Sequence, residues 1–167
     1  MPLDTSVLIA LCDPSQSMHG AVPAWLARVT DAVATCPIAE NGAVRILSQP
    51  KYATGSPIST SSAVFAVREM RNVAGYEFWP DDVSLLDTEV FDANALMGPA
   101  QVTDSYLLAL AVKRDAMLVT LDTRLMVSAV TGPQPGICIR CEPASSRSDF
   151  AVLRKRQTGG DCRWIIS

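Results

Sequence analysis

Histidine is nearly absent from this chain, because among its 167 residues there is only one, His19. That residue falls in a polar turn, and we interpret it as a surface residue. A hydrolase built on a histidine triad needs an imidazole beside its nucleophile, and the chain offers no other. The sequence therefore argues against histidine-dependent catalysis and against a histidine-bound zinc ion.

Two nucleotide-binding motifs are also missing. Neither G-x-x-x-x-G-K-[ST] nor G-x-G-x-x-G occurs, which argues against P-loop and Rossmann proteins. The longest wholly apolar run, Tyr106 to Val112, is far too short to cross a bilayer. Residues 1–4 lack the basic segment that opens a secretory signal. We therefore expect a cytoplasmic protein with no membrane contact.

Cysteine is present, but in a pattern that excludes a disulfide framework. The five cysteines are odd in number and scattered along the chain. Cys138 and Cys141 form a C-x-x-C pair. A zinc or redox site would need a second pair, or a thioredoxin-like strand and helix before it, and neither is present. We therefore assign no function to this pair.

Charge is sparse and uneven. Charged residues make up 19% of the chain and the net charge is −3, yet residues 144–167 alone carry +3, which leaves −6 for the remainder. An acidic body is a poor general binder of nucleic acid. Any role on RNA would depend on a bound metal, on local arginines or on a partner. The basic tail is interpreted as a solvated, partly disordered end rather than as a phosphate-binding arm.

The apolar fraction of 49% is typical of a globular protein, and the length fits one domain with a real core. Helices are predicted over residues 22–29, 38–48, 59–72, 92–97, 104–113 and 124–130, and strands over 32–36, 76–79, 116–121 and 137–140. Because helices alternate with short apolar strands, we predict an α/β fold with right-handed crossovers and a mostly parallel sheet. Residues 1–140 form the predicted domain. Residues 141–167 form an atypical basic tail that is expected to pack poorly.

Four acidic residues stand where apolar runs meet helix starts or loops. Asp4 and Asp122 fall at apparent strand ends, Asp104 opens a helix that Thr103 is expected to cap, and Glu40 lies inside a helix. In parallel sheets, functional groups collect beyond the carboxyl ends of the strands. Singly, each acid has an ordinary explanation as a helix cap, a helix-dipole partner, a turn residue or an ion-pair partner.

Together, the four acids predict a metal site. Carboxylates that converge from distant parts of a chain repel one another unless a cation lies between them. Mg²⁺ and Mn²⁺ prefer such hard oxygen ligands and keep waters for a substrate phosphate. Arg45, which follows Glu40 by five positions, is interpreted either as steadying a phosphate or a carboxylate, or as an ordinary surface arginine.

Four stretches of the sequence, in this order, resemble PIN-domain ribonucleases, specifically the VapC-type toxins of bacterial toxin–antitoxin pairs. They are residues 3–11, 34–48, 102–111 and 118–125. The resemblance implies a PIN-like three-layer fold, with a central, mostly parallel sheet flanked by helices. It also implies that Asp4, Glu40, Asp104 and Asp122 are the family's acidic quartet. Ser6 and Thr120 match small polar residues that line the same site.

The resemblance further implies an activity and partners. Such enzymes cut single-stranded or loop RNA with Mg²⁺ or Mn²⁺, form homodimers and are inhibited by a VapB-type antitoxin. In-line attack by water would leave a 5′-phosphate and a 3′-hydroxyl. Asp4 and Asp104 are the expected direct ligands, and Glu40 and Asp122 are expected to complete the set directly or through water.

Two alternatives stay open. One is a catalytically impaired PIN-like module that binds antitoxin or RNA, which the short lead of Met1 to Leu3 before Asp4 and the unusual tail favour. The other is a phosphotransferase of the haloacid dehalogenase type, which also opens with a strand-end aspartate. That family has a second aspartate two residues later, where this chain has Ser6, so we disfavour it.

Overall fold

The computed structural model describes residues 1–50, 52, 58–96, 98–122, 125 and 127–131, together with the backbone of 139–140, 151–158 and 161–166. Its elements in chain order are α1 (Thr5–Cys12), α2 (Ala21–Leu26), β1 (Val33–Thr35), α3 (Pro37–Leu47), α4 (Thr60–Arg68), the 3-10 helix η1 (Glu69–Asn72), β2 (Tyr76–Phe78), the 3-10 helix η2 (Ala93–Ala95), α5 (Gln101–Lys113), β3 (Ile139–Arg140), β4 (Ala151–Thr158) and β5 (Asp161–Ile166). None of the described helices is long and apolar enough to span a membrane.

A short parallel sheet forms the centre. Strand β1 pairs with β2 in parallel, with Val33 opposite Tyr76. On its other side β1 is bridged in parallel by Pro2, and Leu3 is bridged in parallel by Val119. The predicted strand over 116–121 is thus reduced to one bridge at Val119. Four chain segments therefore run side by side in one direction. The first of them along the chain, at Leu3, lies directly beside the last, at Val119.

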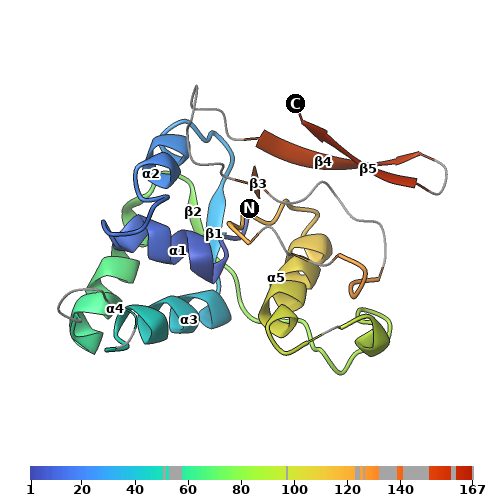
Figure 1. Ribbon diagram of the computed structural model, residues 1–167, viewed down its shortest axis with the longest axis horizontal. Coiled ribbons are helices and arrows are strands. Elements are labelled where there is room, and N and C mark those ends of the chain that lie inside the picture. Colours follow the sequence, from blue (N-terminus) through green and yellow to red (C-terminus); the bar gives the residue numbers. More distant parts are fainter. Residues whose placement is uncertain are drawn as a thin grey trace.

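Helices cover this sheet on both sides, as Figure 1 shows: α1, α3 and α4 lie together, and α5 stands across β1 from them. The middle of α5, Ser105 to Ala111, is wholly buried. Most of the largest fully buried side chains come from α1, α5 and the paired segments, and they include Leu3, Leu8, Leu107 and Leu118. The predicted α/β fold with a mostly parallel sheet between helices is confirmed.

One helix starts earlier than predicted. Thr103 does not cap α5, since the helix begins at Gln101 with Ala100 at its N-cap. The reason is the turn before it, in which Gly98 accepts a hydrogen bond from the Gln101 amide at 3.1 Å. That turn supplies acceptors before Thr103 is reached. Asp104 consequently lies in the first turn of α5 rather than at its opening residue.

Other predicted helices also differ from the structure. Residues 59–72 form α4, capped by the Ser59 side chain, and then tighten to the 3-10 helix η1. The helix predicted over 124–130 is wrong over 127–130, which form a turn and a bridge. Here the Ala129 carbonyl accepts from the Asp92 amide at 3.0 Å, and Val130 bridges Phe91. This pairing uses backbone groups that a helix would need.

The last part of the chain contains paired strands. Strand β3 pairs with β4, and β4 pairs with β5 as an antiparallel hairpin in which Thr158 lies opposite Asp161. Figure 1 draws this hairpin apart from the helices that surround β1. Cys138 and Cys141 lie outside the described residues, and so do the side chains of β3, β4 and β5. The poor packing expected for the tail therefore stays a prediction.

Candidate active site

Asp4 is held at the junction of the sheet and α1. The Leu3 amide donates to the Ala34 carbonyl at 2.8 Å, and the Asp4 amide donates to the Val119 carbonyl at 2.9 Å. Asp4 has extended dihedrals and stands at the N-cap of α1, and its carbonyl accepts from the Val7 amide at 3.0 Å. The short segment before it is therefore fixed from both sides despite its length.

The Asp4 carboxylate is buried and paired with hydroxyl groups. Its side chain is only 4% exposed, and its Oδ2 accepts from Ser6 Oγ at 2.6 Å and from Thr120 Oγ1 at 2.7 Å. The same two hydroxyls also accept hydrogen bonds from the backbone: the Leu121 amide donates to Ser6 Oγ, and the Asp122 amide donates to Thr120 Oγ1. Hydrogen bonds of this kind offset the cost of burying a carboxylate. They also couple the position of Asp122 to that of Asp4.

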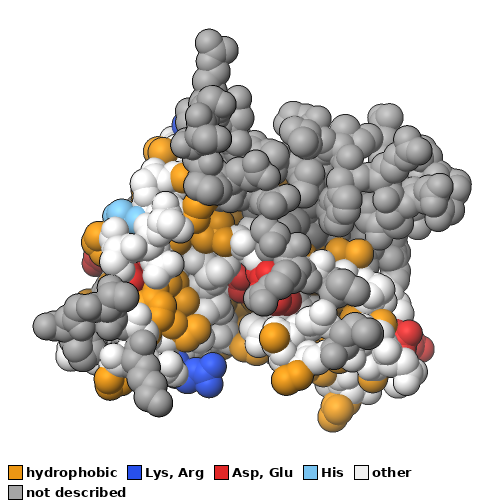
Figure 2. All heavy atoms as spheres, in the orientation of Figure 1, with side chains coloured by type: hydrophobic (Ala, Val, Ile, Leu, Met, Phe, Trp, Pro, Cys, Tyr) orange, Lys and Arg blue, Asp and Glu red, His pale blue; other side chains and the backbone are white. Residues whose placement is uncertain are grey.

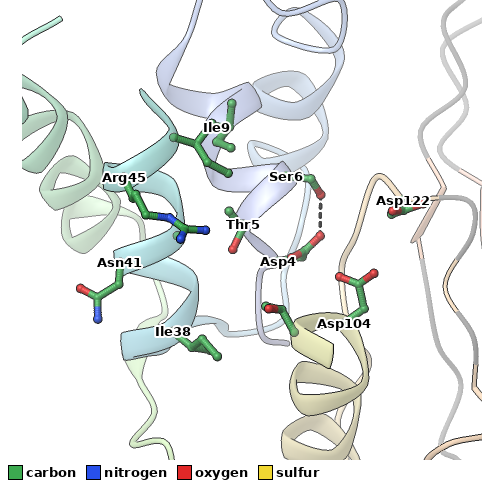
Figure 3. Close-up of a pocket in the computed structure, with 12 residues that line it drawn as sticks. Asp4, Thr5, Ser6, Ile9, Ile38, Asn41, Arg45, Asp104 and Asp122 are labelled. Carbon is green, nitrogen blue, oxygen red and sulfur yellow. Dashed lines mark hydrogen bonds between the residues drawn. The ribbon is translucent and has the colours of Figure 1, made fainter. Parts of the chain in front are cut away.

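Asp4, Asp104 and Asp122 line one pocket of about 500 Å³. They come from the start of α1, the first turn of α5 and the segment after the Val119 bridge. Figure 3 shows the three carboxylates facing one another across the pocket, with Ser6 bonded to Asp4. In Figure 2 acidic side chains gather at the centre of the same face, between α1 and α5. Three of the four predicted acids are thus brought together.

Glu40, the fourth predicted acid, does not line that pocket. Its Oε1 accepts from Thr35 Oγ1 at 2.6 Å, and from the Tyr76 hydroxyl at 3.4 Å. Thr35 and Tyr76 also share a hydrogen bond of 2.8 Å between their hydroxyls. The carboxylate is therefore directed toward the ends of β1 and β2. Its predicted role as a metal ligand is not tested by this arrangement and stays a prediction.

Helix α3 forms the opposite wall of the pocket through Asn41, Gly42 and Arg45. Figure 3 shows Arg45 reaching toward Thr5 in α1, while Asn41 points away from the aspartates. A Cβ added to Gly42 would lie 2.8 Å from Thr5 Oγ1, so the absence of a side chain at residue 42 lets α1 and α3 approach closely. No motif in the sequence singles out Thr35, Tyr76, Asn41 or Gly42. A glycine inside an otherwise regular helix is the one signal that pointed to this contact.

Neither cysteine side chain that the structure describes can serve as a nucleophile at neutral pH. Burial raises the pKa of the Cys36 thiol to about 12. Burial, and then the charge of Asp13, raise the pKa of Cys12 to about 11. Since the thiolate is the reactive form, both stay inert.

The donors in the pocket fit a hard divalent cation in chemical type, because they are aspartate oxygens with no histidine or cysteine among them. Their spacing is looser than that of a finished site. Within the part of the chain that the structure describes, no three histidine, cysteine or acidic side chains lie close enough to hold an ion as they stand.

Comparison with known proteins identifies relatives over most of the chain. The chain is 42% identical over 131 residues to the ribonuclease VapC44 of Mycobacterium tuberculosis, and this alignment covers 78% of this chain and 91% of the relative. It is 38% identical over 133 residues to the ribonuclease VapC39 of the same organism, covering 78% of this chain and 94% of the relative. No family model matches the chain.

A solved structure gives a weaker likeness. The crystal structure of Mycobacterium tuberculosis VapC20, a sarcin–ricin loop cleaving toxin, aligns with a TM-score of 0.47 and 14% sequence identity. The alignment covers 70% of this chain and 85% of that chain.

Proposed function

The chain belongs to the VapC family of ribonucleases, and we propose that it is a metal-dependent endoribonuclease, the toxin of a toxin–antitoxin pair. The observation that carries this proposal is the single pocket lined by Asp4, Asp104 and Asp122. These residues are far apart in sequence, and the fold brings all three to one hollow. A phosphodiester bond is the substrate that suits such a site, because a cation held there offsets the substrate's charge.

In the proposed site, Asp4 and Asp104 hold Mg²⁺ or Mn²⁺, and Asp122 completes the set directly or through water. A bound divalent ion would act as a Lewis acid, lowering the pKa of a bound water and offsetting negative charge on the phosphoryl oxygens. Ser6 and Thr120 fix the Asp4 carboxylate by donating to its Oδ2. Their contribution is to keep one ligand in a single orientation, which is the usual role of groups that support a metal ligand.

The chain's other groups act on the substrate and the water. Arg45, on the opposite wall, places a positive charge where a phosphate enters. Asp122 orients the attacking water, whose in-line attack leaves a 5′-phosphate and a 3′-hydroxyl. Glu40 stays a proposed ligand, directly or through water, and to reach the pocket it must exchange its hydrogen bonds to Thr35 and Tyr76.

The remaining parts of the proposal concern partners and place. We propose that the chain acts in the cytoplasm, where its RNA substrate is found. We also propose that it forms a homodimer and is inhibited by a VapB-type antitoxin that covers the aspartate pocket. Membership of the VapC family supports the antitoxin, since an unrestrained ribonuclease must be blocked at its site.

The test is cleavage of single-stranded RNA by purified full-length protein with Mg²⁺ or Mn²⁺. Asp104→Asn should abolish cleavage without unfolding the protein, and EDTA in excess should do the same reversibly. Asp115→Asn is the matched control, because Asp115 is an exposed aspartate just beyond the other end of α5, with a positive φ that asparagine also accepts. Sequencing of the new RNA ends checks the expected 5′-phosphate.

The results of the cleavage assay distinguish a ribonuclease from a module that only binds. Cleavage retained by pure Asp104→Asn protein would refute the proposed site. The catalytically impaired, binding-only module is favoured by one observation: Glu40 does not line the aspartate pocket and is instead hydrogen-bonded to Thr35 and Tyr76. It predicts that the unmodified chain binds RNA or antitoxin without cutting RNA at any concentration of Mg²⁺ or Mn²⁺.

A further inference from the structure

A second groove runs beside the aspartate pocket, between α3 and α4. Its volume is about 530 Å³, and its polar lining comprises Glu40, Asn41, Arg45, Ser48, Thr60, Arg68 and Arg71. Ser59 caps α4 at the end of the helix where Thr60 lies, and Arg68 and Arg71 lie at the other end, where α4 passes into η1. The lining therefore combines basic groups with hydroxyl and amide donors.

The charge of this groove is positive, although the body of the protein is acidic. Arg45, Arg68 and Arg71 are exposed, and both ion pairs found among the described residues involve Asp82, which does not line the groove. The single carboxylate in the lining, Glu40, is engaged by Thr35 and Tyr76. Figure 2 shows one basic patch at the lower edge of the face, below α3. Guanidinium groups gathered without carboxylate partners suit an anion with several phosphates.

One of these arginines is held in place by an aromatic ring. The Arg68 guanidinium lies 5.4 Å from the centroid of the Phe65 ring, within the range of a cation–π contact. Phe65 is 61% exposed and Val64, which lines the groove, is 39% exposed. Exposed apolar faces beside arginines are the combination by which proteins bind single-stranded nucleic acid, since bases stack while phosphates pair.

The groove adjoins the aspartate pocket. Asn41 and Arg45 line both hollows, and Figure 3 shows the two residues on α3 with Arg45 reaching toward the pocket and Asn41 pointing away from it. Helix α3 is thus a ridge between a basic groove and an acidic site. A strand that enters the pocket with one phosphate can cross this ridge and lay its neighbouring phosphates in the groove.

We propose that the α3–α4 groove binds the sugar–phosphate backbone of single-stranded RNA beside the cleaved bond, through Arg68 and Arg71, with Arg45 at the junction. The inference rests on the proposed function, since it names how the same site holds its substrate. It also explains how a chain of net charge −3 retains RNA: the positive groups are concentrated at one groove next to the metal-binding carboxylates.

The experiment measures binding of a fluorescein-labelled single-stranded RNA in EDTA, where no variant cleaves the probe, at several salt concentrations. The double variant Arg68→Ala, Arg71→Ala should bind more weakly. Its slope of log affinity against log salt should fall in magnitude by about 1.4, because each lost phosphate contact on a single strand contributes about 0.7. Arg68→Lys with Arg71→Lys keeps both charges and should retain most of the slope. Arg28→Ala, an exposed arginine beyond the end of α2 that lines neither hollow, is the matched control.

Each outcome decides the inference. Unchanged affinity and slope in the alanine double variant would overturn it. So would a change in its mass by light scattering, which would make the groove an interface between copies, or a loss of antitoxin binding with RNA binding intact. Because the assay needs no cleavage, failure of the groove leaves the Asp104→Asn test untouched, and failure of that test leaves this one interpretable.

Discussion

Asp4 is the residue at which the fold and the proposed chemistry meet. One of its oxygens, Oδ2, accepts from both Ser6 and Thr120, while its backbone amide pairs with Val119. The carboxylate is therefore oriented by groups from two segments of the chain before any ligand arrives. Thr120 has a second task, because its hydroxyl accepts from the Asp122 amide. A single hydroxyl thus aligns two of the three aspartates.

Thr120→Val tests this arrangement with a side chain of nearly the same shape. Loss of a buried hydroxyl that serves two partners should lower the free energy of unfolding by about 1–3 kcal/mol. Cleavage should fall by about 10–100-fold, the usual effect of removing a group that orients a metal ligand. Urea unfolding and initial cleavage rates measure the two effects.

Thr120→Ser, which restores the hydroxyl, should recover most of the activity. Thr88→Val, at an exposed threonine remote from the pocket, is the control and should change neither quantity. Full activity in Thr120→Val would show that the Asp4 carboxylate does not need this donor.

At the scale of elements, α5 is positioned at both ends. Its first turn presents Asp104 to the pocket. At its other end Lys113 and Arg114 each lie 3.1 Å from Asp82 Oδ2, and the Arg114 guanidinium stacks 4.9 Å from the Trp79 ring centroid. These contacts tie the end of α5 to the segment after β2. Whatever holds this end also limits how far Asp104 can move along the helix axis.

The Asp82 contacts give a pH-dependent contribution to stability. Burial acts to raise the pKa of Asp82. The hydrogen bond from Lys113 and the charges of Arg114 and Lys113 together outweigh burial, so the pKa lies below its ordinary value. A carboxyl whose pKa is lowered by folding stabilises the protein above its unfolded pKa, about 3.9. That contribution is lost as the pH falls through the folded pKa.

Asp82→Asn should therefore cost stability at pH 7 and cost progressively less below about pH 4. The loss at pH 7 should be small, about 0–1 kcal/mol, because the pair is solvent-exposed and screened. Urea midpoints of both proteins across this pH range provide the measurement. A difference that stays constant with pH would mean that Asp82 acts through its shape or through hydrogen bonds that do not depend on its charge.

Across the whole molecule, the convergence of three acids could be predicted because it follows from topology. Leu3 bridges Val119 in a parallel sheet, so the residues just after them, including Asp4 and Asp122, must emerge at one edge. Asp104 joins them because α5 packs across that edge. Strand-end position and helix start were both visible in the sequence.

The direction of Glu40 could not be predicted in the same way. It depends on Thr35 and Tyr76, which lie in separate strands and approach only because of the register that pairs β1 with β2. Register is a property of the assembled sheet, and the local pattern around Glu40 carries no signal for it. For a related reason the start of α5 was misplaced, since a turn at Gly98, rather than a threonine side chain, sets it.

The proposed activity depends most on Asp4 and Asp104 holding one divalent ion between them. The direct measurement is anomalous X-ray diffraction from crystals of the protein grown with Mn²⁺. We predict an anomalous peak in the aspartate pocket, with carboxylate oxygens of Asp4 and Asp104 at roughly 2.0–2.2 Å, the distance expected for small hard cations. A pocket without an anomalous peak in crystals of protein that cleaves RNA with Mn²⁺, or a peak bound by other residues, would contradict it.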